Sequence, residues 1–292
     1  MTDRSAIVVG AGITGVSTAE WMRRDGWHVT LVDRVRPGSP EQTSYGNAGV
    51  LASASVVPVS TPGLALKVPG MLLDPDSPLF LRWSHLPRMV PWFLAFLRQG
   101  RRERVMEIAK ALSGIAYDSV EQHQTLADGT AAAKFIHVAP YVYVYKDRKA
   151  YEGDLFGHAL RREHGFPSEE IDGSELRAAD PALSDSVGFG VSYENHGYIS
   201  SPGGYTAALA DHFLEAGGRF EEGEVADITP NEAGGEVALA DGRRLAGDKI
   251  VLSAGVWSRA FAEKLGHRTP MVAERGHHLM LHGASARPPY PT

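Results

Sequence analysis

The sequence contains no cysteine, which excludes disulfides, thiol catalysis, cysteine-ligated metals and a cysteinyl link to a cofactor. It has no long basic block and a net charge of −6, so we expect no nucleic-acid partner. The pair His277-His278 lacks the spacing and the carboxylate partners of a metal site, and we assign no metal. The missing cysteines fit a reducing compartment, and we expect a cytoplasmic protein.

Long hydrophobic runs are missing too. Nowhere do about 18–20 apolar residues follow one another, so the sequence predicts no membrane-spanning helix. The apolar start lacks a basic leader with a clean hydrophobic region, so we expect no signal peptide. Residues 89–97 are apolar and aromatic, and arginines follow at 98, 101, 102 and 104. A packed helix is the favoured interpretation, and a peripheral helix on the inner face of a membrane is the alternative.

Glycine, in contrast, is abundant. The 32 glycines in 292 residues make up about 11% of the chain, against a usual ~7%. This content suits a fold in which backbone approaches a ligand closely. The length suffices for a sizeable core and favours two intertwined domains.

The most informative segment begins with residues 6–9, an apolar run of strand length that leads into Gly10, Gly12 and Gly15. This is the glycine spacing of the dinucleotide-binding fingerprint. Gly10 permits a tight turn, Gly12 lets a pyrophosphate approach the backbone, and Gly15 lets a helix pack against the strand. A helix over about 14–25 would direct its free N–H groups and positive dipole end at that pyrophosphate.

A second strand, at 27–32, ends in Asp33, 23 residues after Gly10. A carboxylate there accepts hydrogen bonds from a ribose diol and repels a ribose 2′-phosphate, which disfavours NADP. Because strand, helix, second strand and acid all occur in order, we predict a dinucleotide site rather than a plain strand–turn–helix. The motif does not separate NAD from FAD.

Further elements follow along the chain. Alternating Tyr and Val at 141–145 predict a strand within a β segment over 134–146. The other expected elements are a long helix over 103–130, helices over 151–185, strands at 187–191 and 197–199, a helix over 205–216, a strand at 249–253 and a helix over 257–265.

Nucleotide-type elements therefore occur at both ends of the chain. A nicotinamide enzyme normally continues its first domain with regular strand–helix units. This chain instead leaves the first domain after two strands and returns to its sheet more than 200 residues later. That organisation favours FAD, whose longer body needs contacts from separated segments. We predict an α/β fold: a Rossmann-like FAD-binding domain of residues 1–57 plus about 200–266, and a discontinuous second domain on a mixed or antiparallel sheet, 58–199 plus 267–292.

The sequence resembles the flavin-dependent oxidoreductases of the D-amino-acid oxidase/glycine oxidase superfamily, above all the bacterial D-amino-acid and D-hydroxyproline dehydrogenases. The Ser-x-x-Asn-Ala-Gly element at 44–49 is the most specific part of the likeness. Two departures are that Asp33 stands where the family usually has Glu, and that relatives continue beyond residue 292, so we expect an incomplete substrate domain. The likeness rests on 10–15 with 33–34, on 43–49, and on 62–67, 92–94, 251–258 and 274–278.

The resemblance implies an FAD site with contributions from five segments. Ser44 and Asn47 have an alternative role as simple turn residues. The implied contacts are Gly10, Gly12, Ile13, Thr14 and Gly15 at the pyrophosphate; Asp33 and Arg34 at the ribose; Ser44, Asn47, Ala48, Gly49, Val50 and Leu51 beside pyrophosphate and isoalloxazine; Val225 at the adenine; and Ser253, Ala254, Gly255 and Trp257 along the ribityl chain.

The resemblance also implies oxidation of a D-amino acid by hydride transfer to the flavin, followed by hydrolysis of the imine. Arg275 is the candidate that holds the substrate carboxylate, and His278 the candidate near the flavin or the substrate amine. Purely structural roles are the alternatives for both, and core packing is the default for Tyr143 and Tyr145.

Other functions remain open at this point. Glycine, sarcosine or D-hydroxyproline oxidation is the nearest, with oxygen or a quinone as electron acceptor. A non-catalytic nucleotide-binding fragment and an NAD-dependent dehydrogenase are more distant alternatives.

Overall fold

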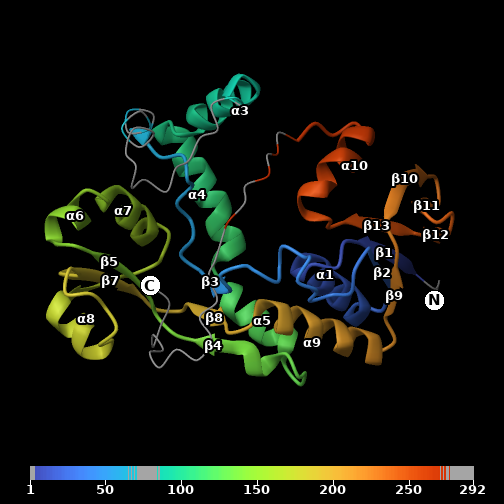
Figure 1. The fold of residues 1–292 in the computed structure, drawn as a ribbon, viewed down its shortest axis with the longest axis horizontal. Helices are drawn as coiled ribbons and strands as arrows, with labels where there is room; N and C mark the ends of the chain where they lie inside the picture. Colours follow the sequence, from blue (N-terminus) through green and yellow to red (C-terminus); the bar gives the residue numbers. More distant parts are fainter. Residues whose placement is uncertain are drawn as a thin grey trace. The chain divides into compact units, whose positions relative to one another are not determined.

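The computed structural model describes residues 4–64, 84 and 86–269, and the single positions 66, 68, 70, 271, 273 and 276. The chain forms two compact units, whose elements are labelled in Figure 1. The described residues of the first unit fall within 4–50, 121–137 and 198–276, and those of the second fall within 51–120 and 138–197. The first unit thus includes 121–137, which the sequence analysis assigned to the second domain.

The first unit is built on a four-stranded parallel sheet with the order β13-β1-β2-β9. The apolar run that predicted a strand becomes central β1, which is buried because neighbours pair with both of its edges. Helices α1 (Ile13–Arg24) and α9 (Pro202–Glu215) lie side by side (Figure 1). The strands are β1 (Ser5–Val9), β2 (His28–Asp33), β9 (Arg219–Glu222) and β13 (Lys249–Leu252).

An antiparallel sheet, β10-β11-β12, covers one face of the parallel sheet. Ile7 and Val9 of β1 pack there against Ile228, Val237 and Leu239. Because side chains alternate along a strand, the residues between them face the side of α1. The remaining elements are β10 (Val225–Asn231), β11 (Gly234–Leu239), β12 (Arg244–Gly247), α5 (Ser119–Ala127), η2 (Ala133–Phe135), η3 (Gly255–Trp257) and α10 (Ser258–Lys264).

A buried carboxylate anchors α1. Glu20 is fully buried and accepts hydrogen bonds from Arg23 and Arg24, while His212 of α9 lies 3.5 Å away. Arg24 also donates to the carbonyl of Leu126, at the end of α5. Burial raises the pKa of Glu20, but the hydrogen bonds from the two arginines outweigh it and hold the pKa below its ordinary value. Glu20 therefore stays charged and ties three helices together.

The second unit contains the antiparallel sheet β5-β7-β6. Helices α6 and α7 lie on one side of β5 and β7, and α8 lies on the other (Figure 1). The elements are α3 (Leu86–Gln99), α4 (Arg102–Ala116), β5 (Tyr141–Tyr145), α6 (Arg148–Glu152), α7 (Leu155–Glu163), β6 (Glu169–Asp172), α8 (Gly173–Ala179) and β7 (Phe189–Tyr193). Where the chain passes from one unit to the other, β3 (Val50–Leu51), β4 (Ile136–Val138) and β8 (Gly197–Ile199) form a small sheet.

The structure is the predicted α/β fold, with two corrections to its elements. The single long helix expected over 103–130 is wrong: α4 ends at Ala116, and α5 begins at Ser119. Asp118 and Ser119 are residue types that favour helix starts over helix interiors. The segment 151–185, expected to be helical, also contains β6, whose hydrogen bonds go to β7. In the part of the chain that the structure describes, no helix is long and apolar enough to span a membrane.

Candidate functional site

The turn between β1 and α1 requires glycine at two positions. Gly10 has a φ of +102°, and a Cβ on it would lie 2.5 Å from the carbonyl oxygen of Ser253. A Cβ on Gly15 would lie 1.7 Å from the carbonyl oxygen of Gly10. The chain therefore turns sharply after β1, and α1 packs directly on that turn.

The N-terminus of α1 carries no acidic residue in its first turn, and its N-cap is Gly12, which offers no side chain. Ser44, from a loop 31 residues further on, accepts a hydrogen bond of 2.9 Å from the Ile13 N–H. A Cβ on Gly12 would lie 3.0 Å from the Ser44 Oγ. Because Ser44 is neutral and the first turn holds no acid, the helix start keeps its positive potential, which suits an anionic ligand such as a pyrophosphate.

Asp33 lies at the end of β2 and is held against the same turn. Its Oδ2 accepts hydrogen bonds from the Ala11 N–H (2.7 Å) and from Gln42 Nε2 (3.1 Å). Gln42 in turn accepts the Gly38 N–H through Oε1 (2.9 Å). Both bonds use one oxygen of Asp33, so a ribose diol would find acceptor capacity on the other. Sequence reasoning missed Gln42, because no spacing marks a glutamine in this loop.

The loop that follows Ser44 is organised by its own side chains. Asn47 Oδ1 accepts a 2.5 Å hydrogen bond from the Gly49 N–H, an Asx turn of the kind anticipated as the alternative role of Asn47. Gly49 has a φ of +70°, and its carbonyl accepts the Ile199 N–H at 2.6 Å. Val50 and Leu51 then form β3. The turn fixes where the backbone of residues 47–49 lies.

A second segment reaches the same end of the parallel sheet. The Ser253 N–H donates to the Val9 carbonyl at 2.7 Å, and Gly255 follows with a φ of +56°. The guanidinium of Arg34, just past β2, lies 4.6 Å from the ring centroid of Trp257. Since carboxyl ends of parallel strands share one edge of a sheet, these predicted residues come together around the glycine turn.

Val225 also lies near the carboxyl end of the parallel sheet. Two residues before it, the Gly223 N–H donates to the Asp33 carbonyl at 2.8 Å. Arg275 and His278 lie outside the described residues. No group of three or more His, Asp or Glu side chains within the described ranges is arranged to hold a metal ion.

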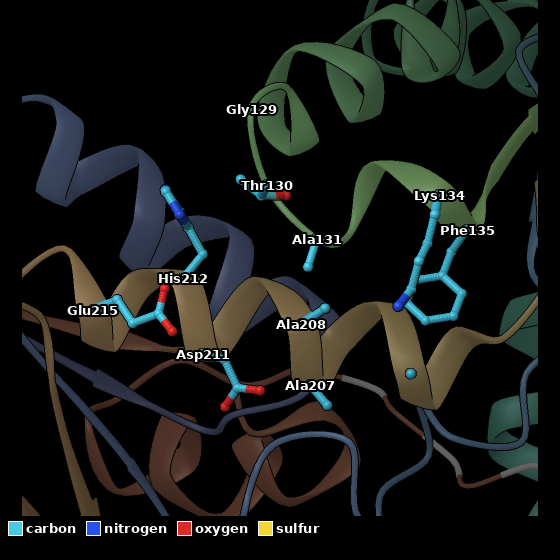
Figure 2. Close-up of a pocket in the computed structure, with 11 residues that line it drawn as sticks. Gly129, Thr130, Ala131, Lys134, Phe135, Ala207, Ala208, Asp211, His212 and Glu215 are labelled. Carbon is cyan, nitrogen blue, oxygen red and sulfur yellow. The ribbon is translucent and has the colours of Figure 1, made fainter.

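Two cavities of the first unit are lined by other residues. One, of about 400 Å³, opens between α9 and residues 129–135, and Figure 2 shows Lys134, Asp211, His212 and Glu215 among its lining residues. The other, of about 440 Å³, follows β10 and β13. Neither includes a residue of the glycine turn.

The second unit contains a buried polar cluster that sequence reasoning did not identify. His158 of α7 is fully buried between the hydroxyls of Tyr145 (2.7 Å from Nε2) and Tyr193 (2.6 Å from Nδ1). Burial, aided by the nearby Arg161, lowers the pKa of His158 to about 4. Burial raises the pKa of Tyr143, Tyr145 and Tyr193 above the ordinary value. Near neutral pH the imidazole is therefore uncharged and the tyrosines are protonated.

Comparison with known proteins shows what the chain is similar to. Residues 5–292 match the protein family described as FAD dependent oxidoreductase, DAO. A D-amino-acid oxidase of Bradyrhizobium diazoefficiens is 34% identical over 286 residues, which cover 98% of this chain and 68% of the relative. D-amino acid dehydrogenase 2 of Ralstonia nicotianae is 32% identical over 290 residues, covering 94% and 65%.

Among solved structures, glycine oxidase from Bacillus cereus superposes with a TM-score of 0.57 and 18% identity, over 89% of this chain and 58% of that structure. This likeness shows the shared fold. The chain spans about two thirds of the length of the two sequence relatives.

Proposed function

The chain belongs to the DAO family of FAD-dependent oxidoreductases, and on that premise we propose that it oxidises a D-amino acid to the imino acid, which water hydrolyses to a 2-oxo acid and ammonia. The observation that carries this proposal is the 34% identity with a D-amino-acid oxidase along 98% of the chain. The same family assignment makes FAD the cofactor.

The glycine turn of the first unit fits the dinucleotide part of FAD. Side chains on Gly10 or Gly15 would collide with backbone, and the first turn of α1 carries no acidic residue that would oppose an anion. We assign the pyrophosphate to this helix start, the ribose to Asp33 and Arg34, and the adenine to the backbone at Val225. The further proposed contacts are Ile13, Thr14, Ser44, Asn47, Ala48, Gly49, Val50, Leu51, Ser253, Ala254, Gly255 and Trp257.

When bound, the flavin accepts the hydride that leaves the substrate Cα. The protein then needs to orient the substrate, bind its carboxylate and receive the proton that the amine loses. A cation is required for the carboxylate, and a guanidinium suits it best because two parallel N–H groups match two oxygens. Arg275 and His278 remain proposals for the carboxylate and the amine, and both lie outside the described residues.

Steady-state turnover tests this function. We expect FAD-loaded protein with a dye acceptor to form 2-oxo acid and ammonia from D-amino acids and not from their L-enantiomers. Turnover of glycine, sarcosine or D-hydroxyproline alone would assign another substrate within the family. Dependence on nicotinamide, or flavin binding without turnover of any of these substrates, would contradict the proposal.

The electron acceptor is a separate question, since the relatives are named both oxidase and dehydrogenase. Parallel assays with oxygen and with a soluble quinone distinguish the two. For a quinone acceptor we propose peripheral membrane contact through α3. Its Val90 and Leu94 side chains are 41% and 51% exposed, and Arg88 and Arg98 are exposed near its ends.

A further inference from the structure

The buried tyrosine–histidine cluster of the second unit contains a continuous path of hydrogen bonds from the core to the solvent. The path consists of Tyr193 of β7, His158 of α7, Tyr145 of β5 and Asp154, just before α7. The Tyr193 hydroxyl lies 2.6 Å from His158 Nδ1, and His158 Nε2 lies 2.7 Å from the Tyr145 hydroxyl. Tyr145 then donates to Asp154 Oδ2 at 2.9 Å. Since the Asp154 side chain is 53% exposed, the path joins a buried phenol to a carboxylate in contact with water.

The hydrogen-bond partners fix the position of each proton in this path. An ionised carboxylate only accepts hydrogen bonds, so the single hydroxyl proton of Tyr145 is directed at Asp154. The Tyr145 oxygen then accepts from His158, which places the proton of the uncharged imidazole on Nε2. His158 Nδ1 is therefore the acceptor, and Tyr193 donates to it. Every donor points from Tyr193 towards Asp154, so a proton can leave Tyr193 by successive transfers along existing hydrogen bonds.

The surroundings of the cluster oppose a positive charge inside it. The charged groups that act on His158 are Arg161, Arg162, Asp154 and Glu170. Burial and the two arginines outweigh the two acids, which is why the pKa of His158 lies at about 4. The guanidinium carbon of Arg161 also lies 5.7 Å from the ring centroid of Tyr193. A proton received by the imidazole is therefore passed on towards Asp154 rather than kept.

Contacts between aromatic rings provide a separate route for an electron. The ring centroids of Tyr193 and Tyr143 are 5.8 Å apart, and those of Tyr143 and Tyr141 are 5.0 Å apart. Tyr141 and Tyr143 are half-buried, so the rings connect Tyr193 with the surface of the second unit. Because the sequence has no cysteine thiol to be oxidised first, its tyrosines are natural one-electron donors. Five of the ten tyrosines lie in this group of rings: Tyr141, Tyr143, Tyr145, Tyr151 and Tyr193.

We propose that Tyr193 is a one-electron redox site, which an external one-electron oxidant such as a peroxyl radical converts to a neutral tyrosyl radical. The electron leaves through Tyr143 and Tyr141, and the oxidant is reduced by that one electron. The O–H bond of Tyr193 breaks as an N–H bond forms at His158 Nδ1. The Nε2 proton moves to Tyr145, whose own proton moves to Asp154 and from there to water. This role is independent of the proposed function, since it involves neither flavin nor amino-acid substrate.

Rapid mixing with hexachloroiridate(IV) in the dark tests this role in the oxidised, FAD-loaded protein. Freeze-quenched samples are measured by electron paramagnetic resonance. Protein grown on ring-deuterated tyrosine identifies a tyrosyl signal, because the splittings from ring protons disappear. We expect a tyrosyl radical in the wild type and its loss in Tyr193→Phe, which keeps the ring and removes the hydroxyl. Tyr117→Phe, at a 60% exposed site of the same unit, is the matched control and should leave the signal unchanged.

The proton path is tested separately from the phenol. We expect the radical to form about tenfold or more slowly in His158→Gln and in Asp154→Asn, because each variant loses a proton acceptor and with it a hydrogen bond of the path. The wild-type rate should also fall in heavy water, since a proton leaves together with the electron. Asp185→Asn, at an exposed site of the same unit, is the control for Asp154. Should His158→Gln fail to fold, Asp154→Asn decides the outcome, because its side chain lies at the surface.

Four results would each overturn the inference. They are the absence of a tyrosyl signal in the wild type, an undiminished signal in Tyr193→Phe, equal rates in the wild type and Asp154→Asn, and a rate that heavy water does not change. The measurement needs no amino-acid substrate. A failure of the D-amino-acid turnover assay is therefore distinguishable from a failure of this inference.

Discussion

At the scale of single residues, Asp33 carries the strongest consequence for cofactor binding. Its carboxylate is oriented by the Ala11 N–H and by Gln42, and it is the proposed acceptor for the ribose diol. We expect Asp33→Asn to raise the FAD dissociation constant about 10- to 100-fold, because a charged acceptor becomes a neutral one. Titration of apoprotein by flavin fluorescence measures this. Asp211→Asn, an exposed site on α9, is the control, and equal affinities for the two variants would contradict the role of Asp33.

His158 predicts a pH dependence of stability. Its folded pKa of about 4 lies below the unfolded value near 6.5, so the unfolded chain takes up a proton first as the pH falls. Stability is therefore complete above about pH 6.5, and about 3 kcal/mol is lost towards pH 4. Urea unfolding as a function of pH measures the effect, which His158→Gln should reduce and His267→Gln, at an exposed site, should not. Parallel pH profiles for wild type and His158→Gln would contradict this origin.

Residue-scale prediction succeeded where spacing carries meaning. The spacing of Gly10 and Gly15 predicted a sharp backbone turn. In the structure, a side chain at either position would collide with backbone atoms. Gln42 and His158 carry no such pattern, because their partners are brought close only by the folded chain. Ser44 was expected from family resemblance, but the structure adds that it caps α1.

At the scale of elements, the packing of α1 on its own turn makes Gly15 irreplaceable. A Cβ there would lie 1.7 Å from the Gly10 carbonyl oxygen, so we expect Gly15→Ala to lose several kcal/mol of unfolding free energy and to bind no FAD. Gly114→Ala in α4, where nothing lies within 4 Å, should instead gain about 0.5–1 kcal/mol. Chemical denaturation compares them. A stabilising effect at both positions would show that α1 does not pack as described.

Helix α3 supports a prediction about membranes. We expect the protein to sediment with vesicles containing phosphatidylglycerol, and Leu94→Asp to weaken this about tenfold or more because one apolar anchor is lost. Ile115→Asp, at a 78% exposed site on α4, is the control. Failure of the wild type to sediment at low salt would rule out peripheral contact through α3.

Element prediction failed where tertiary contacts override local pattern. Periodicity suggested one helix over 103–130, yet two polar residues at 118–119 allow a break between α4 and α5. Strand β6 reads Glu-Glu-Ile-Asp, which has no strand character, and it forms because β7 offers it a partner. The single β segment expected over 134–146 contains two strands, β4 and β5, and the tyrosine–valine alternation lies in β5.

At the scale of the whole molecule, the proposed dinucleotide site belongs to the first unit, and the buried tyrosine–histidine cluster belongs to the second. The sequence was sufficient for the fold class, because apolar strands and glycine spacing encode it, and the resemblance over several segments supplied the family and FAD. It was not sufficient for the cluster around His158, since the imidazole meets Tyr145 and Tyr193 only through the pairing of β5 with β7 and the packing of α7.

The visible absorption spectrum of the purified, FAD-loaded protein tests the central claim most directly. It is recorded without oxygen, before and after addition of D-alanine and, separately, L-alanine. We predict a flavin band that bleaches with the D-enantiomer and persists with the L-enantiomer. A band that persists with D-alanine and with every other D-amino acid, or the absence of any flavin band after addition of FAD, would contradict the account.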